Sequence, residues 1–271
     1  MFQLLHEALA TADPLAKADQ AEAIWCAWSA GQLDPKSTPV APPLQPGRPA
    51  TPVLVAPQSL TPRKLGSIEG RAALVHAIAH IEFNAINLAL DAACRFPGMP
   101  RDYYGDWIRV AAEEAGHFRL LNDHVNGLGY AYGDFPAHNG LWEMAEKTAG
   151  DVLARMALVP RLLEARGLDV TPAMQARLIA AGDREAAAIL DIVFRDEVGH
   201  VLVGNRWFRW LCTARGLDPL VAFREHLHAF DAPRHIGELN VEARLRAGFE
   251  ADELDVLRQF AQTNRHTAPQ Q

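Results

Sequence analysis

Cysteine, long apolar runs and export signals are scarce or absent in this sequence. The 271 residues include three cysteines, Cys26, Cys94 and Cys212, and their odd number and wide spacing exclude a disulfide framework. No stretch approaches the roughly 20 consecutive apolar residues of a membrane-spanning helix, and the first residues lack the basic segment and cleavage site of a signal peptide. We therefore expect a cytoplasmic protein with no membrane partner, in which the three thiols are buried and reduced.

Positive charge and the common nucleotide-binding motifs are also scarce. Lysine and arginine total 26 against 33 acidic residues, which leaves a formal net charge of -7 and no basic stripe for a phosphate backbone. No Gly-x-Gly-x-x-Gly, Walker-type loop or Gly-x-Ser-x-Gly turn occurs. A nucleic-acid partner, nucleotide-driven chemistry and serine hydrolysis are therefore not expected. Hydrophobic residues make up 49% of the chain, enough for the core of one large domain or two small ones.

Helical periodicity dominates the sequence after an N-terminal extension. Residues 2–31 predict two short helices, and the proline-rich segment 31–62 predicts either a linker or an extended strap across a domain. From Ser67 to Arg215 no period-two alternation occurs, so long helices are expected there. Their predicted ranges are 67–96, 102–126, 140–166 and 172–215, with a kink at Pro160, a stop at Gly167, a new start at Thr171–Pro172 and a break near Gly182–Asp183.

This pattern predicts an all-α protein built around a four-helix bundle. We expect the N-terminal extension at residues 1–64, the bundle at residues 65–230, and a C-terminal helical tail at residues 231–271 that packs on the bundle. Short helices are expected at 219–230 and 250–264.

Two of the predicted long helices carry the same five-residue pattern. One contains Glu-Glu-Ala-Gly-His, which ends at His117, and the other contains Asp-Glu-Val-Gly-His, which ends at His200. Residues three apart on a helix project from the same side, so Glu114 can reach a common point with His117, as can Glu197 with His200. A single short motif of this kind is weak, whereas two matching copies on separate helices strongly indicate metal ligands.

A dinuclear carboxylate site also requires one glutamate from each of the other two helices. Glu82 lies in an apolar helical stripe, where an unpaired carboxylate would cost several kcal/mol, and Glu164 has the matching place on the third helix. Glu82 precedes Glu114 by 32 residues and Glu164 precedes Glu197 by 33, which indicates two helical hairpins of one plan. The expected metal ligands are Glu82, Glu114, His117, Glu164, Glu197 and His200.

Carboxylates and imidazoles without thiolates suit two iron ions, two manganese ions or a mixed pair better than structural zinc. The order Glu, Glu-x-x-His, Glu, Glu-x-x-His resembles the ferritin-like di-iron carboxylate superfamily. More narrowly, HIEFNAINLALDAACRF, EEAGHF, EARGLD and DEVGH are similar to a bacterial ferritin-like family of unknown function. The resemblance spans residues 65–230 and implies the bundle fold and the two metal ions. It further implies that the acids Glu113 and Asp196, which precede the motif glutamates, hydrogen-bond the ligand imidazoles.

Taken with the ligand set, the resemblance implies an oxidoreductase that activates O2 or peroxide to hydroxylate or oxidise a small-molecule substrate, supplied by an electron donor. A non-catalytic protein that binds or handles iron is the alternative. A second alternative is an enzyme like the tRNA-modifying hydroxylases of the superfamily, against which the acidic balance argues unless a local basic patch exists. A homo-oligomer is compatible with each of these functions.

Overall fold

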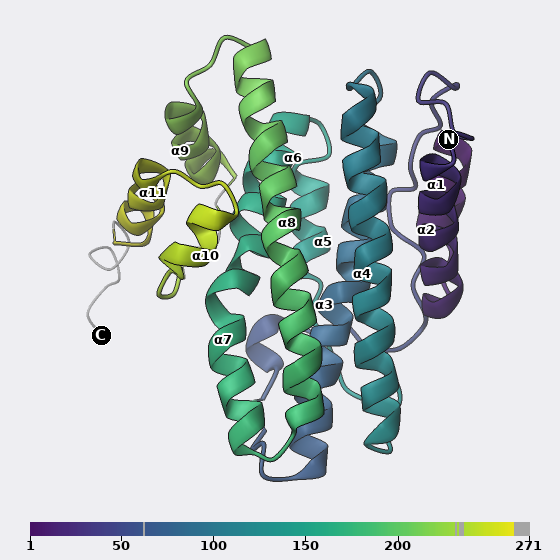
Figure 1. Ribbon diagram of the computed structural model, residues 1–271, viewed down its shortest axis with the longest axis vertical. Helices are drawn as coiled ribbons and strands as arrows, with labels where there is room; N and C mark the ends of the chain where they lie inside the picture. The colour runs from purple at the N-terminus through teal and green to yellow at the C-terminus, as the bar shows by residue number, and fades with distance from the viewer. Residues whose placement is uncertain (62, 231, 233–235, 263–271) are drawn as a thin grey trace. The chain divides into compact units, whose positions relative to one another are not determined.

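The computed structural model describes residues 1–61, 63–230, 232 and 236–262 (Figure 1). Within these ranges all regular secondary structure is helical, and the one β-type contact is an isolated bridge between Leu54 and Ala137. The all-α prediction is confirmed. The chain forms two compact units: unit 1 comprises Met1–Glu146 and Ala173–Val193, and unit 2 comprises Lys147–Pro172 and Phe194–Gln271. The expected division at residues 64 and 230 stays a prediction.

Unit 1 is built around two long helices, α3 and α4, which pack extensively against each other. Ser67 caps α3 because its side chain accepts a hydrogen bond from the Gly70 N–H at 3.0 Å. The short connection at residues 96–100 contains two prolines and makes α3 and α4 antiparallel neighbours. The helices that lie wholly or mainly in unit 1 are α1 (Phe2–Ala10), α2 (Pro14–Ser29), the 3-10 turn η1 (Pro57–Ser59), α3 (Ile68–Arg95), α4 (Arg101–Gly127) and α5 (Gly140–Lys147).

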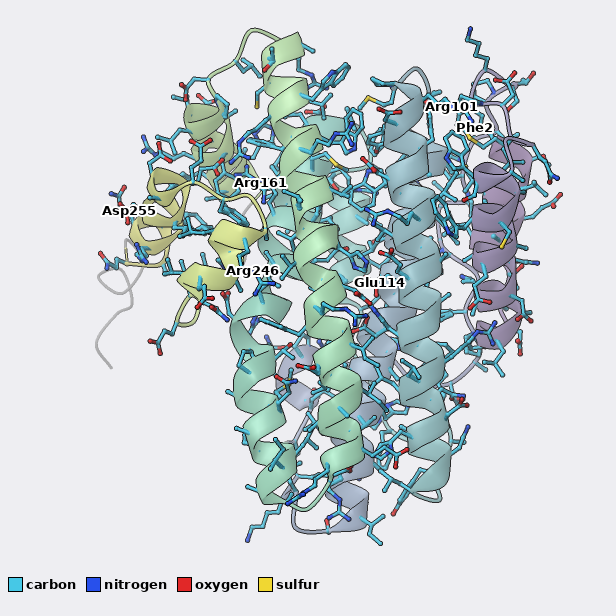
Figure 2. All side chains as sticks on the ribbon, in the orientation of Figure 1. Phe2, Arg101, Glu114, Arg161, Arg246 and Asp255 are labelled. Atoms are coloured by element: carbon cyan, nitrogen blue, oxygen red, sulfur yellow. The ribbon has the colours of Figure 1, made fainter. Side chains whose placement is uncertain are left out.

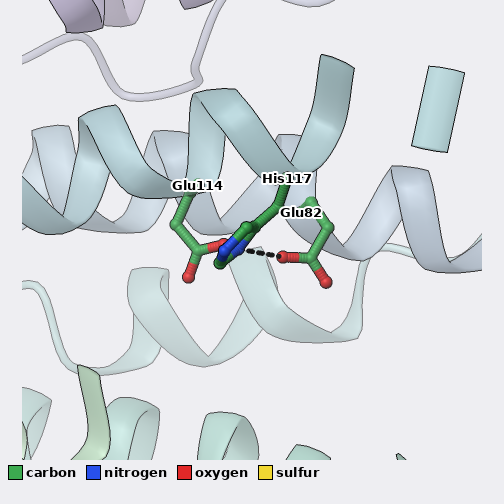
Figure 3. A group of neighbouring side chains, drawn as sticks. All are labelled: Glu82, Glu114 and His117. Carbon is green, nitrogen blue, oxygen red and sulfur yellow. Dashed lines mark hydrogen bonds and ion pairs between the residues drawn. The ribbon is translucent and has the colours of Figure 1, made fainter. Parts of the chain in front are cut away.

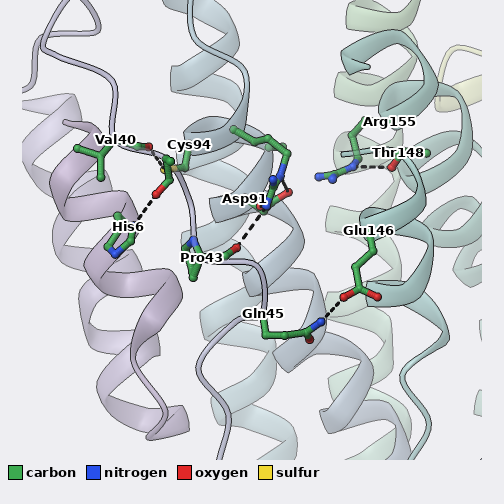
Figure 4. Close-up of polar contacts among 12 residues, drawn as sticks. His6, Val40, Pro43, Gln45, Asp91, Cys94, Glu146, Thr148 and Arg155 are labelled. Atoms are coloured by element: carbon green, nitrogen blue, oxygen red, sulfur yellow. Dashed lines mark hydrogen bonds and ion pairs between the residues drawn. The ribbon is translucent and has the colours of Figure 1, made fainter. Parts of the chain in front are cut away.

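The proline-rich segment between α2 and α3 lies against α1 and α3 (Figure 4). The Cys94 thiol donates to the Val40 carbonyl at 3.5 Å, and the Arg95 guanidinium donates to the Pro43 carbonyl at 3.4 Å. Farther along the segment, the Gly47 N–H donates to the Leu9 carbonyl of α1 at 2.8 Å. The segment is therefore an extended strap, whose backbone carbonyls are used by side chains at the C-terminal end of α3.

Unit 2 contains the middle of the chain and its C-terminal helices. Its elements are α6 (Val152–Leu158), the π-helical segment η2 (Val159–Glu164), α9 (Pro219–Ala229), α10 (Val241–Arg246) and α11 (Ala251–Gln262). Two further helices, α7 (Ala165–Ala180) and α8 (Arg184–Ala214), begin in one unit and end in the other. The short helices expected near residues 219–230 and 250–264 are confirmed within the described residues, whereas the sequence did not predict α10.

The boundaries predicted for the third long helix are wrong at two places. The helix expected at 140–166 is interrupted, because α5 ends at Lys147 and α6 begins at Val152, where Asp151 accepts a hydrogen bond from the Leu153 N–H at 3.1 Å. Gly167 does not end a helix and Thr171–Pro172 does not begin one, since α7 runs through both. The break expected near Gly182 is confirmed between α7 and α8.

Pro172 lies inside α7 because a distant residue replaces the hydrogen bond that this proline cannot make. A helical residue at position 172 would donate to the carbonyl of Leu168, and proline has no N–H to donate. Instead, the side-chain amide of Asn240 donates to the Leu168 carbonyl at 3.1 Å. The α7 helix therefore continues with this carbonyl satisfied, at a position where local sequence alone indicates a new helix.

The expectation of three buried thiols is also wrong for one of them. Cys94 and Cys212 are buried free thiols, whereas the free thiol of Cys26 is exposed. The buried face of α2 includes Ala21 and Ile24, and Cys26 lies two residues after Ile24, about 200° around the helix from it.

Among the described residues, one helix, α3, is long and apolar enough to cross a membrane by length and composition. Its most apolar 18-residue window is 78% buried inside the protein, and core helices of water-soluble proteins have the same property. This burial agrees with the expectation of a protein without a membrane span.

Candidate metal centre

In unit 1, α3 and α4 bring Glu82, Glu114 and His117 together (Figure 3). The Nδ1 atom of His117 lies 3.1 Å from Oε2 of Glu114 and 3.4 Å from Oε2 of Glu82. One ligand atom from each of the three residues lies within 4.8 Å of the others. We call these residues the first triad. The predicted convergence of Glu82 with the Glu-x-x-His motif of α4 is therefore observed.

The first triad is buried because its residues interrupt the apolar faces of α3 and α4. Glu82 is 6% exposed, and Glu114 and His117 are each 2% exposed. The helical neighbours of Glu82 include Ile78, Ala79, Ala85 and Ile86, all of them buried as the sequence predicts. Side chains of this polarity are rarely placed in such surroundings unless they are paired or bind a metal.

Burial and mutual contact shift the pKa values of the first triad. Burial raises the pKa of Glu82 well above its ordinary range, and the neighbouring Glu114 carboxylate raises it further. Burial alone lowers the pKa of His117, but hydrogen bonds to Glu114 and Glu82 outweigh this effect and raise the pKa to about 11. In the metal-free protein a proton on the imidazole therefore offsets part of the carboxylate charge, which is the role that a bound cation would take over.

Unit 2 contains the second Glu-x-x-His motif, formed by Glu197 and His200. The Nδ1 atom of His200 lies 3.2 Å from Oε2 of Glu197, which reproduces the 3.1 Å contact between His117 and Glu114. His200 is fully buried and Glu197 is 9% exposed. In both motifs the imidazole Nδ1 atom is thus aimed at the glutamate three residues earlier.

Glu164, the remaining candidate ligand of unit 2, ends the π-helical segment η2. We call Glu164, Glu197 and His200, the three candidate ligands of this unit, the second triad. Its Oε2 atom is buried. Three residues later, a Cβ atom built on Gly167 would lie 3.6 Å from Cγ of Glu197, so this part of the chain is in close contact with the Glu197 side chain. Glu164, Glu197 and His200 therefore belong to one compact unit, as Glu82, Glu114 and His117 belong to the other.

The sequence indicates a kink at Pro160 but not the π-helical segment η2 that contains this proline. Such segments are rare and occur frequently at functional sites. The sequence signal that accompanies η2 is the pair Pro160 and Gly204, because a Cβ atom on Gly204 would lie 2.4 Å from Cβ of Pro160. Only glycine leaves space on α8 for the proline ring.

The two acids that precede the motif glutamates are less buried than the glutamates and histidines of the motifs. Glu113 is 34% exposed and pairs with Arg109 at 3.4 Å. Asp196 is 27% exposed and accepts a hydrogen bond from the Arg195 Nε atom at 2.9 Å. Their expected hydrogen bonds to the imidazoles stay a prediction.

Buried groups of glutamate and histidine such as the first triad can hold a metal ion. Carboxylate oxygen and imidazole nitrogen together suit iron, manganese or zinc. In this motif the side chains, and not the backbone, supply the ligand atoms. The donor set therefore fits the metals expected from the sequence without selecting one of them.

Comparison with known proteins shows a family but no activity. A family model described as "Protein of unknown function (DUF455)" matches residues 10–255, which include all six candidate ligands. A curated relative from Haemophilus influenzae, described as "Uncharacterized protein", is 51% identical over 222 residues, which are 79% of this chain and 77% of the relative. No solved structure matches the chain.

Proposed function

Because this chain belongs to the family described as a protein of unknown function (DUF455), a description that assigns no activity, we propose a function from the two triads. The protein is a ferritin-like dinuclear metal protein in which Glu82, Glu114, His117, Glu164, Glu197 and His200 together hold two metal ions. It acts as an oxidoreductase that uses O2 or peroxide to hydroxylate or oxidise a small molecule.

One observation carries this proposal, which is the repetition of the same buried acid–imidazole contact. The two contacts measure 3.1 and 3.2 Å, both involve Nδ1 of a histidine and Oε2 of the glutamate three residues before it, and both histidines are buried. A structural ion pair would explain one copy. Two copies, each in a compact unit that also contributes a further glutamate, are better explained by two equivalent metal ions.

The chemistry of the donors supports iron or manganese. Four carboxylates and two imidazoles provide hard and intermediate ligands, and no thiolate takes part. A bound pair of iron ions would supply redox chemistry with O2 or peroxide, with electrons from an external donor. The protein contributes ligands that are held by packed helices and buried away from water, which protects an oxidising site from side reactions.

The experiment that tests the proposal is metal analysis after anaerobic loading with ferrous iron. The wild-type protein, the double variant Glu114→Ala/Glu197→Ala and the control Glu69→Gln are loaded in parallel. Glu69 is a matched control because it lies on α3 like Glu82 but is 57% exposed and pairs with Arg63 at 2.7 Å. We expect about two iron ions per chain in the wild type and the control, and loss of both in the double variant.

Addition of O2 to the loaded protein then separates the candidate functions. Consumption of O2 with a change in the optical spectrum supports the oxidoreductase. Two bound ions that do not react with O2 or peroxide would favour the iron-handling alternative. If the wild type binds neither iron nor manganese, or if the double variant retains two ions, the six residues are not the ligands of a dinuclear site.

A further inference from the structure

A buried arginine lies three residues before Glu164, inside the π-helical segment η2. The Arg161 side chain has no exposed surface, and its Nε atom donates to Oδ1 of Asn205 on α8 at 2.7 Å. Its Nη2 atom donates to Oε1 of Glu253 on α11. Figure 2 labels Arg161 among the side chains of the protein. One guanidinium therefore ties η2 to two other helices of unit 2. We call Arg161, Asn205 and Glu253 the arginine clasp.

Aromatic rings hold the guanidinium of the clasp in place. Its central carbon lies 4.0 Å from the centre of the Phe208 ring and 4.1 Å from the centre of the Phe223 ring. Guanidinium groups stack favourably on aromatic faces, and such contacts are stronger when water is excluded. The arginine is thus restrained by two ion or hydrogen-bond partners and by two rings, which leaves little freedom for the segment that carries it.

Glu253 has further hydrogen-bond partners outside the clasp. Besides Arg161, it accepts a hydrogen bond from Nη2 of Arg209 at 2.6 Å and one from the backbone N–H of Glu250 at 2.9 Å. Asn205 extends the same network, since its side-chain amide donates to the Ala247 carbonyl at 2.9 Å. The clasp therefore connects the C-terminal segment to η2 and to α8, the helix that also bears Glu197 and His200.

A π-helical segment needs such restraint more than an α-helix does. Its hydrogen bonds are less regular, and Pro160 removes one donor from its first turn. Glu164 stands at the end of this segment, whereas the other candidate ligands lie within regular α-helices. The position of the Glu164 carboxylate consequently depends on contacts made by the side chains of η2.

We propose that Arg161 and Glu253 are positioning residues for the second triad: the clasp fixes η2 so that Glu164 faces the metal beside Glu197 and His200. The effect of the clasp on metal binding rests on the proposed function, whereas its restraint of η2 does not. The clasp assigns a role to the C-terminal helix α11, which contains none of the candidate ligands.

Two measurements on the full-length protein test the proposal. The first is hydrogen–deuterium exchange of residues 159–167 in the metal-free protein, and the second is stepwise anaerobic titration with ferrous iron. The test variant is Glu253→Gln, which keeps the shape of the side chain and removes its charge. The control is Arg258→Gln, which also removes a charge from α11 but breaks an exposed pair with Asp255 at 2.7 Å.

We expect Glu253→Gln to accelerate exchange in residues 159–167 and to weaken binding of one of the two iron ions by about 10- to 100-fold, as changes to groups that orient metal ligands usually do. Arg258→Gln is expected to leave both quantities as in the wild type. A buried arginine left without its partner can prevent folding. If Glu253→Gln does not fold, the double variant Arg161→Met/Glu253→Met removes both charges together and takes its place.

The outcomes separate failure of the positioning role from failure of the proposed metal function. Unchanged exchange in residues 159–167 overturns the positioning role, whatever metal is bound. Faster exchange with unchanged affinity for both ions overturns it as well, because η2 would then not control a ligand. Faster exchange in a protein whose wild type binds no iron supports the restraint of η2 by the clasp and refutes the metal function instead.

Discussion

A methyl group added at Gly204 provides a sharp test of how η2 and α8 pack. In Gly204→Ala the new Cβ atom would lie 2.4 Å from Cβ and 2.6 Å from Cγ of Pro160. These distances are far below van der Waals contact. The proline ring cannot rotate away because it is part of the backbone of η2, and the neighbouring Arg161 is held by its partners. The two elements must therefore move apart.

The size of the effect follows from two opposing contributions. Extra methyl groups in a packed core typically cost about 1–3 kcal/mol, whereas alanine stabilises a helix interior by about 1 kcal/mol relative to glycine. The matched control is Gly199→Ala in the same helix, because a Cβ atom there meets no atom within 4 Å. This control should show only the gain of about 1 kcal/mol, so the two variants should differ by about 1–3 kcal/mol.

Thermal unfolding of the metal-free variants, followed by circular dichroism, measures this difference. For a protein of this size each kcal/mol corresponds to about 2–4 °C in Tm. We expect Gly199→Ala to melt above the wild type and Gly204→Ala to melt below Gly199→Ala by several degrees. Equal melting temperatures of the two alanine variants would refute the close approach of Pro160 and α8.

Three further predictions concern α2, α3 and the metal. Burial lowers the pKa of Lys17 to about 7, so the unfolded chain holds this proton more tightly than the folded protein does. The free energy of unfolding should therefore rise between about pH 7 and 10 by at most about 1.4 kcal/mol per pH unit. Urea unfolding of Lys17→Met should lack this rise, and the same dependence of unfolding free energy on pH in both proteins would contradict the prediction. Ser67→Ala removes the cap of α3 and should cost about 1 kcal/mol in the same assay, whereas no loss would show that the cap is dispensable. Manganese should raise the Tm of the wild type and of Glu69→Gln but not that of Glu82→Ala, and an equal rise in all three would exclude Glu82 as a ligand.

Much of this fold can be predicted because its signals are local. The ends of α3 and α4 follow from a serine cap, prolines and glycines that lie next to the helix termini in the sequence. The Glu-x-x-His spacing predicts the contact between Glu114 and His117 because helix geometry alone brings these side chains together. Glu82 could be predicted as well, since a carboxylate in an apolar stripe requires a partner.

The continuation of α7 through Pro172 depends on residues far apart in the chain. Thr171–Pro172 has the local signature of a helix start, but Asn240 satisfies the Leu168 carbonyl and lets α7 continue. Local propensity cannot reveal such compensation, since the compensating group lies about 70 residues away in sequence. The interruption between α5 and α6 is a different case, because its signal is local: Asp151 caps α6 by accepting a hydrogen bond from the Leu153 N–H.

The π-helical segment is where local rules are broken most clearly, and it ends at a candidate ligand. Pro160 disfavours a regular helix there, Gly204 lacks a side chain opposite it, and Arg161 is buried at considerable desolvation cost. Departures from local consistency are expected where function imposes them. The two triads are thus alike in their Glu-x-x-His motifs but differ in the third carboxylate: Glu82 is held by a regular helix, whereas Glu164 depends on tertiary contacts. Changes in unit 2 that leave every ligand in place should therefore weaken binding of one metal ion more than the other.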